Sequence, residues 1–130
     1  MSTDREQIEE LLTAYAIALD VDDIEGCVQL FTQDGGFEVY GRRFGGWDGL
    51  RSMMTAAPKG MHFAGRAIID IRGDEATVRS QLIFIEASMA ETRLAIYDDA
   101  VVKAAGQWRF QTRRCRFITP DGLSDRPPKV

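Results

Sequence analysis

Residues 76–118, ATVRSQLIFIEASMAETRLAIYDDAVVKAAGQWRFQTRRCRFI, decide the fold of this chain of 130 residues. The stretch is rich in β-branched and aromatic residues, which favour strands. Two short breaks divide it, and a similar segment precedes it, so that four strands are predicted: 61–72, 76–89, 92–104 and 107–118. Because connections this short join antiparallel neighbours, we expect a long antiparallel meander.

The first half of the chain has the spacing of helices. Apolar residues recur three and four positions apart over 8–19, 24–31 and 50–57, and Pro58 ends the third of these segments. Asp22, three residues before Glu25, resembles the start of a capping box for the second helix. Three N-terminal helices packed on a curved, mainly antiparallel sheet make an α+β domain. We expect one domain over 1–130, with an irregular tail at 119–130.

Composition excludes several classes of partner. Twenty acidic and sixteen basic residues give a net charge of −4, which disfavours nucleic acid. No apolar stretch approaches the roughly 20 residues of a membrane span, and the start MSTDREQIEE lacks the pattern of a signal peptide. We therefore expect a cytoplasmic protein with no membrane contact. Cys27 and Cys115 have no metal or redox spacing and are expected to be reduced thiols in the core.

Asp20 and His62 are the first candidates for chemistry. Asp20 follows the last apolar position of the first helix, where the helix dipole disfavours a negative charge by roughly 0.3–1 kcal/mol. His62 is the only histidine, and one imidazole does not specify a metal site. Strict alternation places His62 on the polar face of its strand, unless a bulge at Gly65 reverses that facing. The alternatives are a solvated loop carboxylate and a histidine with no role in chemistry.

Three further side chains are candidates for contacts with a ligand. Tyr15 lies in the apolar stripe of the first helix, so its hydroxyl needs a partner if it is buried. Glu86 shares a strand face with apolar residues, where an unpaired carboxylate costs several kcal/mol. Arg113 is in phase with Cys115, and a register shift after Phe110 would turn both inward. The alternatives are a core tyrosine, a carboxylate that reaches water and a row of solvated arginines.

Four stretches in this order resemble the SnoaL-like branch of the nuclear-transport-factor-2-like superfamily. They are IEELLTAYAIALD (8–20), VQLFTQDGGFEV (28–39), MHFAGRAIIDIRGDEATVRS (61–80) and YDDAVVKAAGQWRFQTRR (97–114). The resemblance implies a cone-shaped α+β barrel in which helices close one side of the sheet over a deep apolar pocket. It also implies a homodimer or a homotrimer.

Enzymes of this group resemble the chain at their acid–base positions. In scytalone dehydratase, hexachlorocyclohexane dehydrochlorinase and bile acid 7-alpha-dehydratase, the matching pair falls on Asp20 and His62. Tyr15 matches a tyrosine of the bile acid dehydratases, and Arg113 matches the pocket arginine of the dehydrochlorinase. The chain departs from scytalone dehydratase, whose second pocket histidine is absent here and whose tyrosine before the aspartate is Leu19.

The resemblance and the residues together lead to two hypotheses. The first is a cofactor-independent lyase or isomerase, without a metal, acting on a small apolar substrate such as a cyclic one. In it Asp20 orients His62 as the base, and Tyr15 or Arg113 stabilises developing negative charge. The second is a non-catalytic domain that binds a small ligand or serves as a scaffold, like the small subunit of an oxygenase. Since the fold hosts both, the site has to decide between them.

Overall fold

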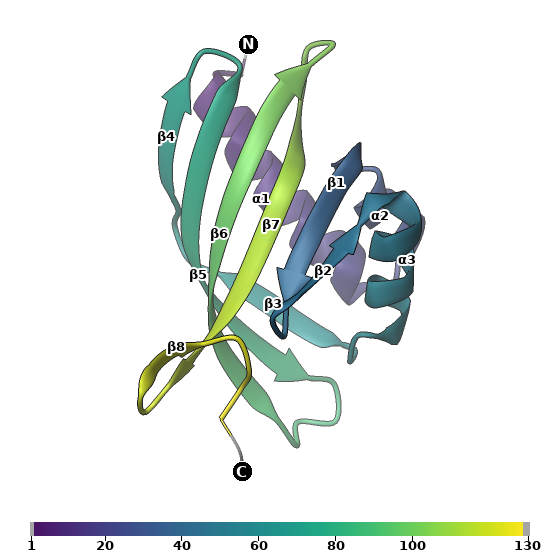
Figure 1. Cartoon of the computed structure of the whole chain (residues 1–130), viewed down its shortest axis with the longest axis vertical. Helices are drawn as coiled ribbons and strands as arrows, with labels where there is room; N and C mark the ends of the chain where they lie inside the picture. The colour runs from purple at the N-terminus through teal and green to yellow at the C-terminus, as the bar shows by residue number, and fades with distance from the viewer. Residues whose placement is uncertain (1, 129–130) are drawn as a thin grey trace.

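Three helices cover one side of a curved eight-stranded sheet in the computed structural model, which describes residues 2–128 (Figure 1). The helices are α1 (Asp4–Asp20), α2 (Ile24–Val28) and α3 (Gly46–Ala56). The strands are β1 (Phe31–Val39), β2 (Arg42–Gly45), β3 (Gly60–Ala64), β4 (Ile68–Arg72), β5 (Glu75–Glu86), β6 (Thr92–Ala104), β7 (Gln107–Thr119) and β8 (Gly122–Ser124). The predicted α+β fold is confirmed, with a sheet that stays open instead of closing into a barrel.

The sheet is mixed but mostly antiparallel. Its main path runs β2-β1-β7-β6-β5-β3, while β4 also pairs with β5 and β8 pairs with β7. Only β1 and β7 pair in parallel among the described strands. In Figure 1, α1 crosses behind the long strands β5, β6 and β7, and α2 and α3 lie beside β1 and β2. One face of the sheet is therefore covered, and the other faces the viewer.

The first predicted strand, 61–72, is interrupted in its middle, and the interruption turns His62 inward. Residues 65–67 separate β3 from β4, and the Gly65 N–H donates to the carbonyl of Gln81 at 3.0 Å. In β3 the even-numbered residues face inward, and in β4 the odd-numbered Ile69 is buried. The alternation has shifted by one residue, which is the effect expected of a bulge at Gly65.

The last long strand contains the register shift that the sequence predicts. Ala100 pairs with Thr112 and Val101 pairs with Phe110, so Gln111 is left without a partner on β6. This extra residue lets Phe110 and Arg113 both be buried although their positions differ in parity. Arg113 faces the interior as a result.

The second helix is shorter than its apolar spacing predicts. It ends at Val28, and Phe31 begins β1 because β1 docks in parallel beside β7, where the Phe110 N–H donates to the carbonyl of Leu30 at 2.8 Å. The predicted cap at Asp22 is also wrong. Asp23 is the N-cap and accepts from the Gly26 N–H at 3.0 Å, whereas Asp22 has φ +64° and lies outside the helix.

The tail expected to be irregular over 119–130 contains a strand. β8 pairs with the end of β7, with Phe117 opposite Ser124 and Thr119 opposite Gly122. Local composition did not predict this strand because its hydrogen bonds come from pairing with β7. Residues 129 and 130 lie outside the described part of the chain.

The core lies between α1 and the covered face of the sheet. α1 begins with a capping box between Thr3 and Glu6, and its buried stripe follows the predicted spacing. That stripe consists of Ile8, Leu11, Leu12, Tyr15 and Leu19. Cys27 and Cys115 are free and buried, as predicted. Across residues 2–128 no helix has the length and apolar character that a membrane crossing needs.

Candidate active site

A pocket of about 470 Å³ lies between α1, α3 and the covered face of the sheet. Its volume is in the range of sites for small molecules. Most of its walls are apolar, with Leu19 from α1, Met53 from α3, and Phe37, Leu82 and Phe117 from the sheet. An apolar enclosure of this kind holds an apolar ligand and strengthens polar interactions on its walls.

His62 lines this pocket and contacts Asp20, which does not itself line it. Asp20 is the last residue of α1, and His62 is the middle residue of β3. Nδ1 of His62 lies 2.7 Å from Oδ1 of Asp20, and the His62 main-chain N–H donates to the same carboxylate at 3.0 and 3.1 Å. Since β3 pairs with a strand on one side only, its outward N–H needs a partner, and Asp20 supplies it. The carboxylate holds both the ring and the backbone of His62.

Burial and the carboxylate act on His62 in opposite directions. Burial lowers its pKa below 6.5, and the bond to Asp20 opposes this shift without cancelling it. The ring also packs on Phe84, with ring centroids 4.7 Å apart. Within residues 2–128 its Nε2 makes no hydrogen bond, so a neutral imidazole offers this nitrogen to a ligand in the pocket.

Arg113 lies beneath the pocket in a cage of aromatic rings. It is 1% exposed, and its guanidinium carbon lies 3.7 Å from the ring centroid of Tyr97, 4.3 Å from that of Tyr15 and 4.7 Å from that of Phe110. Its Nε is 3.1 Å from Oδ1 of Asp99. Burial raises the pKa of Asp99 to about 6, against the opposing effect of Arg113. The positive charge of Arg113 therefore lies directly behind the rings of Tyr15 and Tyr97.

The sequence of this chain matches a known family of proteins. The family model of the SnoaL-like domain matches residues 1–114. The chain belongs to the SnoaL-like family. No curated protein matches this SnoaL-like domain.

The solved structures similar to this SnoaL-like domain include the following three. A protein of unknown function from Mycobacterium tuberculosis is 30% identical with a TM-score of 0.82, over 88% of this chain and 71% of that chain. A candidate scytalone dehydratase from Novosphingobium aromaticivorans is 24% identical with a TM-score of 0.81, over 98% and 90%. A candidate β subunit of an aromatic-ring-hydroxylating dioxygenase from the same organism is 21% identical with a TM-score of 0.72, over 88% of each chain.

Tyr15 and Tyr97 both line the pocket of the SnoaL-like domain. Burial raises the pKa of each phenol above its ordinary range, so both stay protonated and able to donate a hydrogen bond. Tyr15 was a candidate from the sequence, but Tyr97 and Asp99 were not. The available signal was their inward parity on β6, which they share with the apolar Ala95.

Glu86 lies outside the pocket of the SnoaL-like domain. It is the last residue of β5, and its carboxylate accepts a hydrogen bond from the hydroxyl of Ser88 in the following turn. The alternation that pointed it inward ends where the strand ends. His62 and Tyr15 therefore line the pocket, Asp20 contacts His62 and Arg113 contacts the ring of Tyr15. Glu86 is separate from all of them.

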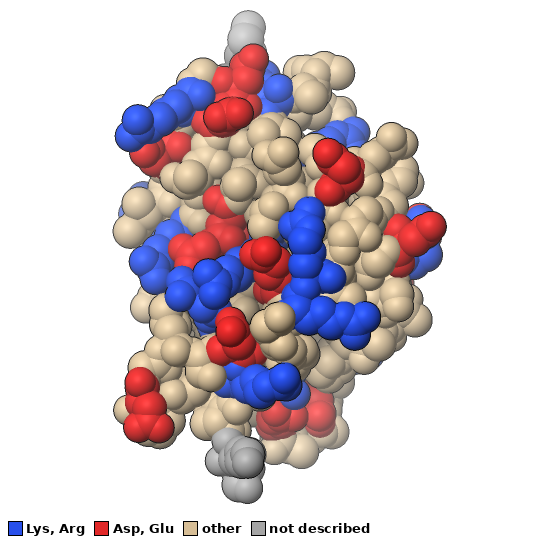
Figure 2. Space-filling model, viewed as in Figure 1, with Lys and Arg blue, Asp and Glu red and all other residues tan. Residues whose placement is uncertain are grey.

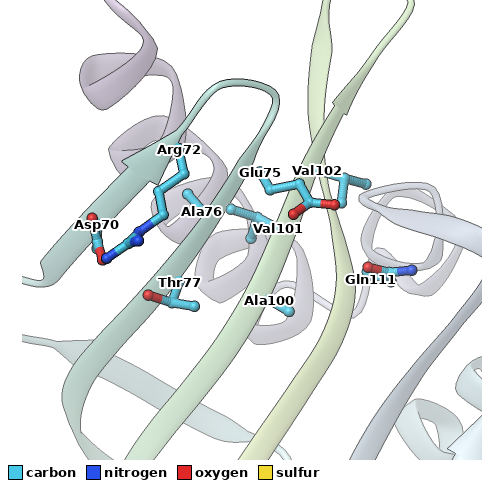
Figure 3. Close-up of a pocket in the computed structure, with 9 residues that line it drawn as sticks. All are labelled: Asp70, Arg72, Glu75, Ala76, Thr77, Ala100, Val101, Val102 and Gln111. Atoms are coloured by element: carbon cyan, nitrogen blue, oxygen red, sulfur yellow. The ribbon is translucent and has the colours of Figure 1, made fainter.

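A smaller hollow of about 190 Å³ lies over β4, β5 and β6 (Figure 3). In Figure 3 the Arg72 side chain is turned toward Asp70. Nη2 of Arg72 lies 3.2 Å from Oδ2 of Asp70. The lining of this hollow contains no histidine, cysteine or tyrosine, so it offers no imidazole of the kind that lines the larger pocket. Among residues 2–128 no three His, Cys, Asp or Glu side chains are grouped as metal ligands.

Proposed function

We propose that this SnoaL-like domain is a cofactor-independent lyase or isomerase of the dehydratase or cyclase kind, acting on a small apolar substrate. The observation that carries the proposal is the 2.7 Å contact between Oδ1 of Asp20 and Nδ1 of His62, whose side chain lines an apolar pocket. A carboxylate and an imidazole in this arrangement make a general base whose second nitrogen faces the substrate.

In this mechanism Asp20 accepts the hydrogen of Nδ1, which leaves Nε2 of His62 as the proton acceptor. Nε2 removes a proton from a carbon next to a carbonyl or a leaving group, and Asp20 stabilises the imidazolium that forms. A lyase then returns the proton to the departing oxygen, and an isomerase returns it to a second carbon. Positioned bases of this kind contribute typically about 10²–10⁴ in rate.

Tyr15 is the proposed donor to the oxygen that becomes negative. Its phenol remains protonated and lies on the pocket wall. Arg113 contacts the ring of Tyr15 from behind, and its positive charge favours negative charge at the phenol and at its ligand. Both groups are set in place before the substrate arrives, which is the condition for stabilising a transition state by electrostatics.

A second candidate function is a non-catalytic binding or scaffolding domain. The exposed apolar side chains on the uncovered face of the sheet favour it, among them Met61, Phe63, Ile83 and Leu94. These side chains also support the proposal that the chain forms a homodimer or a homotrimer. Light scattering of the purified chain measures its mass directly, and a monomer at all concentrations would contradict the oligomer.

The experiment that tests the catalytic proposal uses exchange and elimination together. The chain is incubated in D₂O with a panel of apolar cyclic ketones and β-hydroxy ketones, and deuterium uptake and loss of water are followed by mass spectrometry. We expect turnover in the natural chain and its loss in His62→Ala. The matched control is Asp22→Asn, which removes a carboxylate in the neighbouring loop. Equal rates in the natural chain and in His62→Ala would contradict the proposal.

A further inference from the structure

The charged side chains on the pocket lining are all cationic. Besides His62, the pocket is lined by two arginines, Arg42 on β2 and Arg93 on β6. These two residues are here called the rim arginines. No aspartate or glutamate among residues 2–128 lines this pocket. Two carboxylates lie next to this lining, Glu91 at Arg93 and Asp20 at His62, so the surface offered to a ligand is cationic although the chain as a whole carries a net charge of −4. A local field of this kind attracts an anion to the pocket.

Arg93 is held in place with part of its hydrogen-bonding capacity unused. Its Nη1 donates to the hydroxyl of Tyr40 at 2.7 Å, and its Nε donates to Glu91 at 2.7 Å. A guanidinium has five N–H groups, and the hydrogen bonds within residues 2–128 use two of these. The side chain lines the pocket and is 19% exposed, so Arg93 lies at the boundary between the pocket and solvent.

The backbone at Tyr40 is strained in a way that serves this arrangement. Tyr40 and Gly41 form the two-residue turn between β1 and β2, with φ +58° and +69°. Such turns favour Asn or Gly at the first position, because a positive φ is disfavoured for a residue with a bulky side chain. The Tyr40 ring stacks on Phe117 with centroids 5.6 Å apart, and its hydroxyl holds Arg93. Strain retained at one residue is a sign of function there.

Arg93 and His62 lie in one row across the covered face of the sheet. His62 on β3 is opposite Phe84 on β5, and Phe84 is opposite Arg93 on β6. Neighbouring strands are about 4.8 Å apart, so two spacings separate Arg93 from His62 by roughly 10 Å. Phe84, the middle residue of this row, also lines the pocket, and its ring packs on His62.

We propose that the pocket takes an apolar carboxylic acid, whose ionised carboxylate binds the rim arginines while its apolar body lies along Phe84. The planar guanidinium of Arg93 matches a carboxylate with two parallel hydrogen bonds, and Arg42 adds a second cation. The reacting carbon then lies roughly 10 Å from the carboxylate, beside His62. Only this last step rests on the proposed function, because the acid site itself does not need His62 to be a base.

The test compares two probes of the same shape on the full chain. Biphenyl-4-carboxylate carries the charge, and biphenyl-4-carboxamide does not. We expect calorimetry to give a dissociation constant about tenfold lower for the carboxylate, as charge-assisted hydrogen bonds to arginine provide. This preference should shrink as salt is raised, because the rim is partly exposed. Equal affinity of the natural chain for the two probes would overturn the inference.

Substitutions of the rim arginines test which residues cause the preference for the carboxylate probe. Arg93→Met and Arg42→Met should each reduce it, and the double variant should bind both probes alike. Arg79→Met is the matched control, since Arg79 pairs with Asp98 on the uncovered face and should leave the preference intact. Circular dichroism checks folding, and Arg42→Met is safe in this respect because Arg42 is exposed. A preference that survives in the double variant would contradict the proposal.

His62→Gln separates the acid site from the catalytic proposal. We expect this variant to keep the preference for the carboxylate, because the rim arginines are intact. Loss of the preference in His62→Gln would show that the acid binds the imidazole, and would overturn the inference. If instead the preference holds and no His62-dependent turnover is found, the acid site stands and the catalytic proposal fails.

Discussion

The carboxylate of Asp20 holds His62 at two points, the ring nitrogen Nδ1 at 2.7 Å and the main-chain N–H at 3.0 and 3.1 Å. One contact orients the imidazole, and the other joins the end of α1 to the edge of β3. A negative charge at the end of a helix is disfavoured by the helix dipole, and these bonds compensate for it. The same residue therefore anchors two elements and prepares the base.

The first prediction concerns turnover once a substrate is known. His62→Ala should lower kcat by about 10²–10⁴, because the base is removed. Asp20→Asn should lower kcat with little change in ligand affinity, because the amide favours the wrong tautomer of the ring. Stopped-flow or steady-state kinetics with parallel calorimetry separate the two effects. An Asp20→Asn variant with full activity would contradict the assigned role of Asp20.

The second prediction is the titration of His62. Because burial lowers its pKa, its NMR signal should titrate with a midpoint below 6.5, and activity should fall over the same pH range. The unfolded chain binds this proton more readily than the folded one, so stability also declines as the pH falls below about 6.5. Asp20→Asn should move the midpoint lower still, because it removes a charge that raises this pKa. A midpoint above 6.5 in the natural chain would be inconsistent with a buried neutral base.

The third prediction concerns the buried pair beneath the pocket. Asp99→Ala leaves the charge of Arg113 buried without its partner and should cost about 3–5 kcal/mol of unfolding free energy. Asp98→Ala is the control on the uncovered face, where Asp98 pairs with Arg79 and Arg116 and both signs of charge gather (Figure 2). It should cost at most about 1 kcal/mol. Urea denaturation measures both, and similar losses would contradict the special position of Asp99.

The fourth prediction concerns the thiols. Burial raises the pKa of Cys27 and Cys115 to about 12 each, so neither forms a thiolate near neutral pH. A thiol reagent such as Ellman's reagent should find no reactive cysteine in the folded chain at pH 8 and two after denaturation. Rapid labelling of the folded chain would show that one of these side chains is accessible.

Local pattern predicted the buried stripe of α1 from its helical spacing. It also predicted the inward facing of Arg113, because the parity of the buried residues of β7 changes between Phe110 and Arg113. Asp20 was recognisable as a charge in an unfavourable place. The facing of His62 required an interruption near Gly65 that alternation alone does not locate, since a bulge depends on pairing with β5.

The rest of the site depends on which strands become neighbours. Arg93 and His62 are in one row only because β5 pairs with both β3 and β6. Glu86 has the expected parity, but the pocket ends before the end of β5. Phe31 continues a helical spacing and is nonetheless in β1, because pairing with β7 outweighs local preference.

The most direct test of the central claim is the tautomer of His62 in the free protein. Since it is the only histidine, the ¹⁵N resonances of its ring in a labelled sample at pH 8 need no assignment among others. If Asp20 prepares His62 as a base, the hydrogen is on Nδ1 and Nε2 has the shift of an unprotonated nitrogen, and Asp20→Asn disturbs this state. A hydrogen on Nε2 in the natural chain, unchanged in Asp20→Asn, would contradict the account.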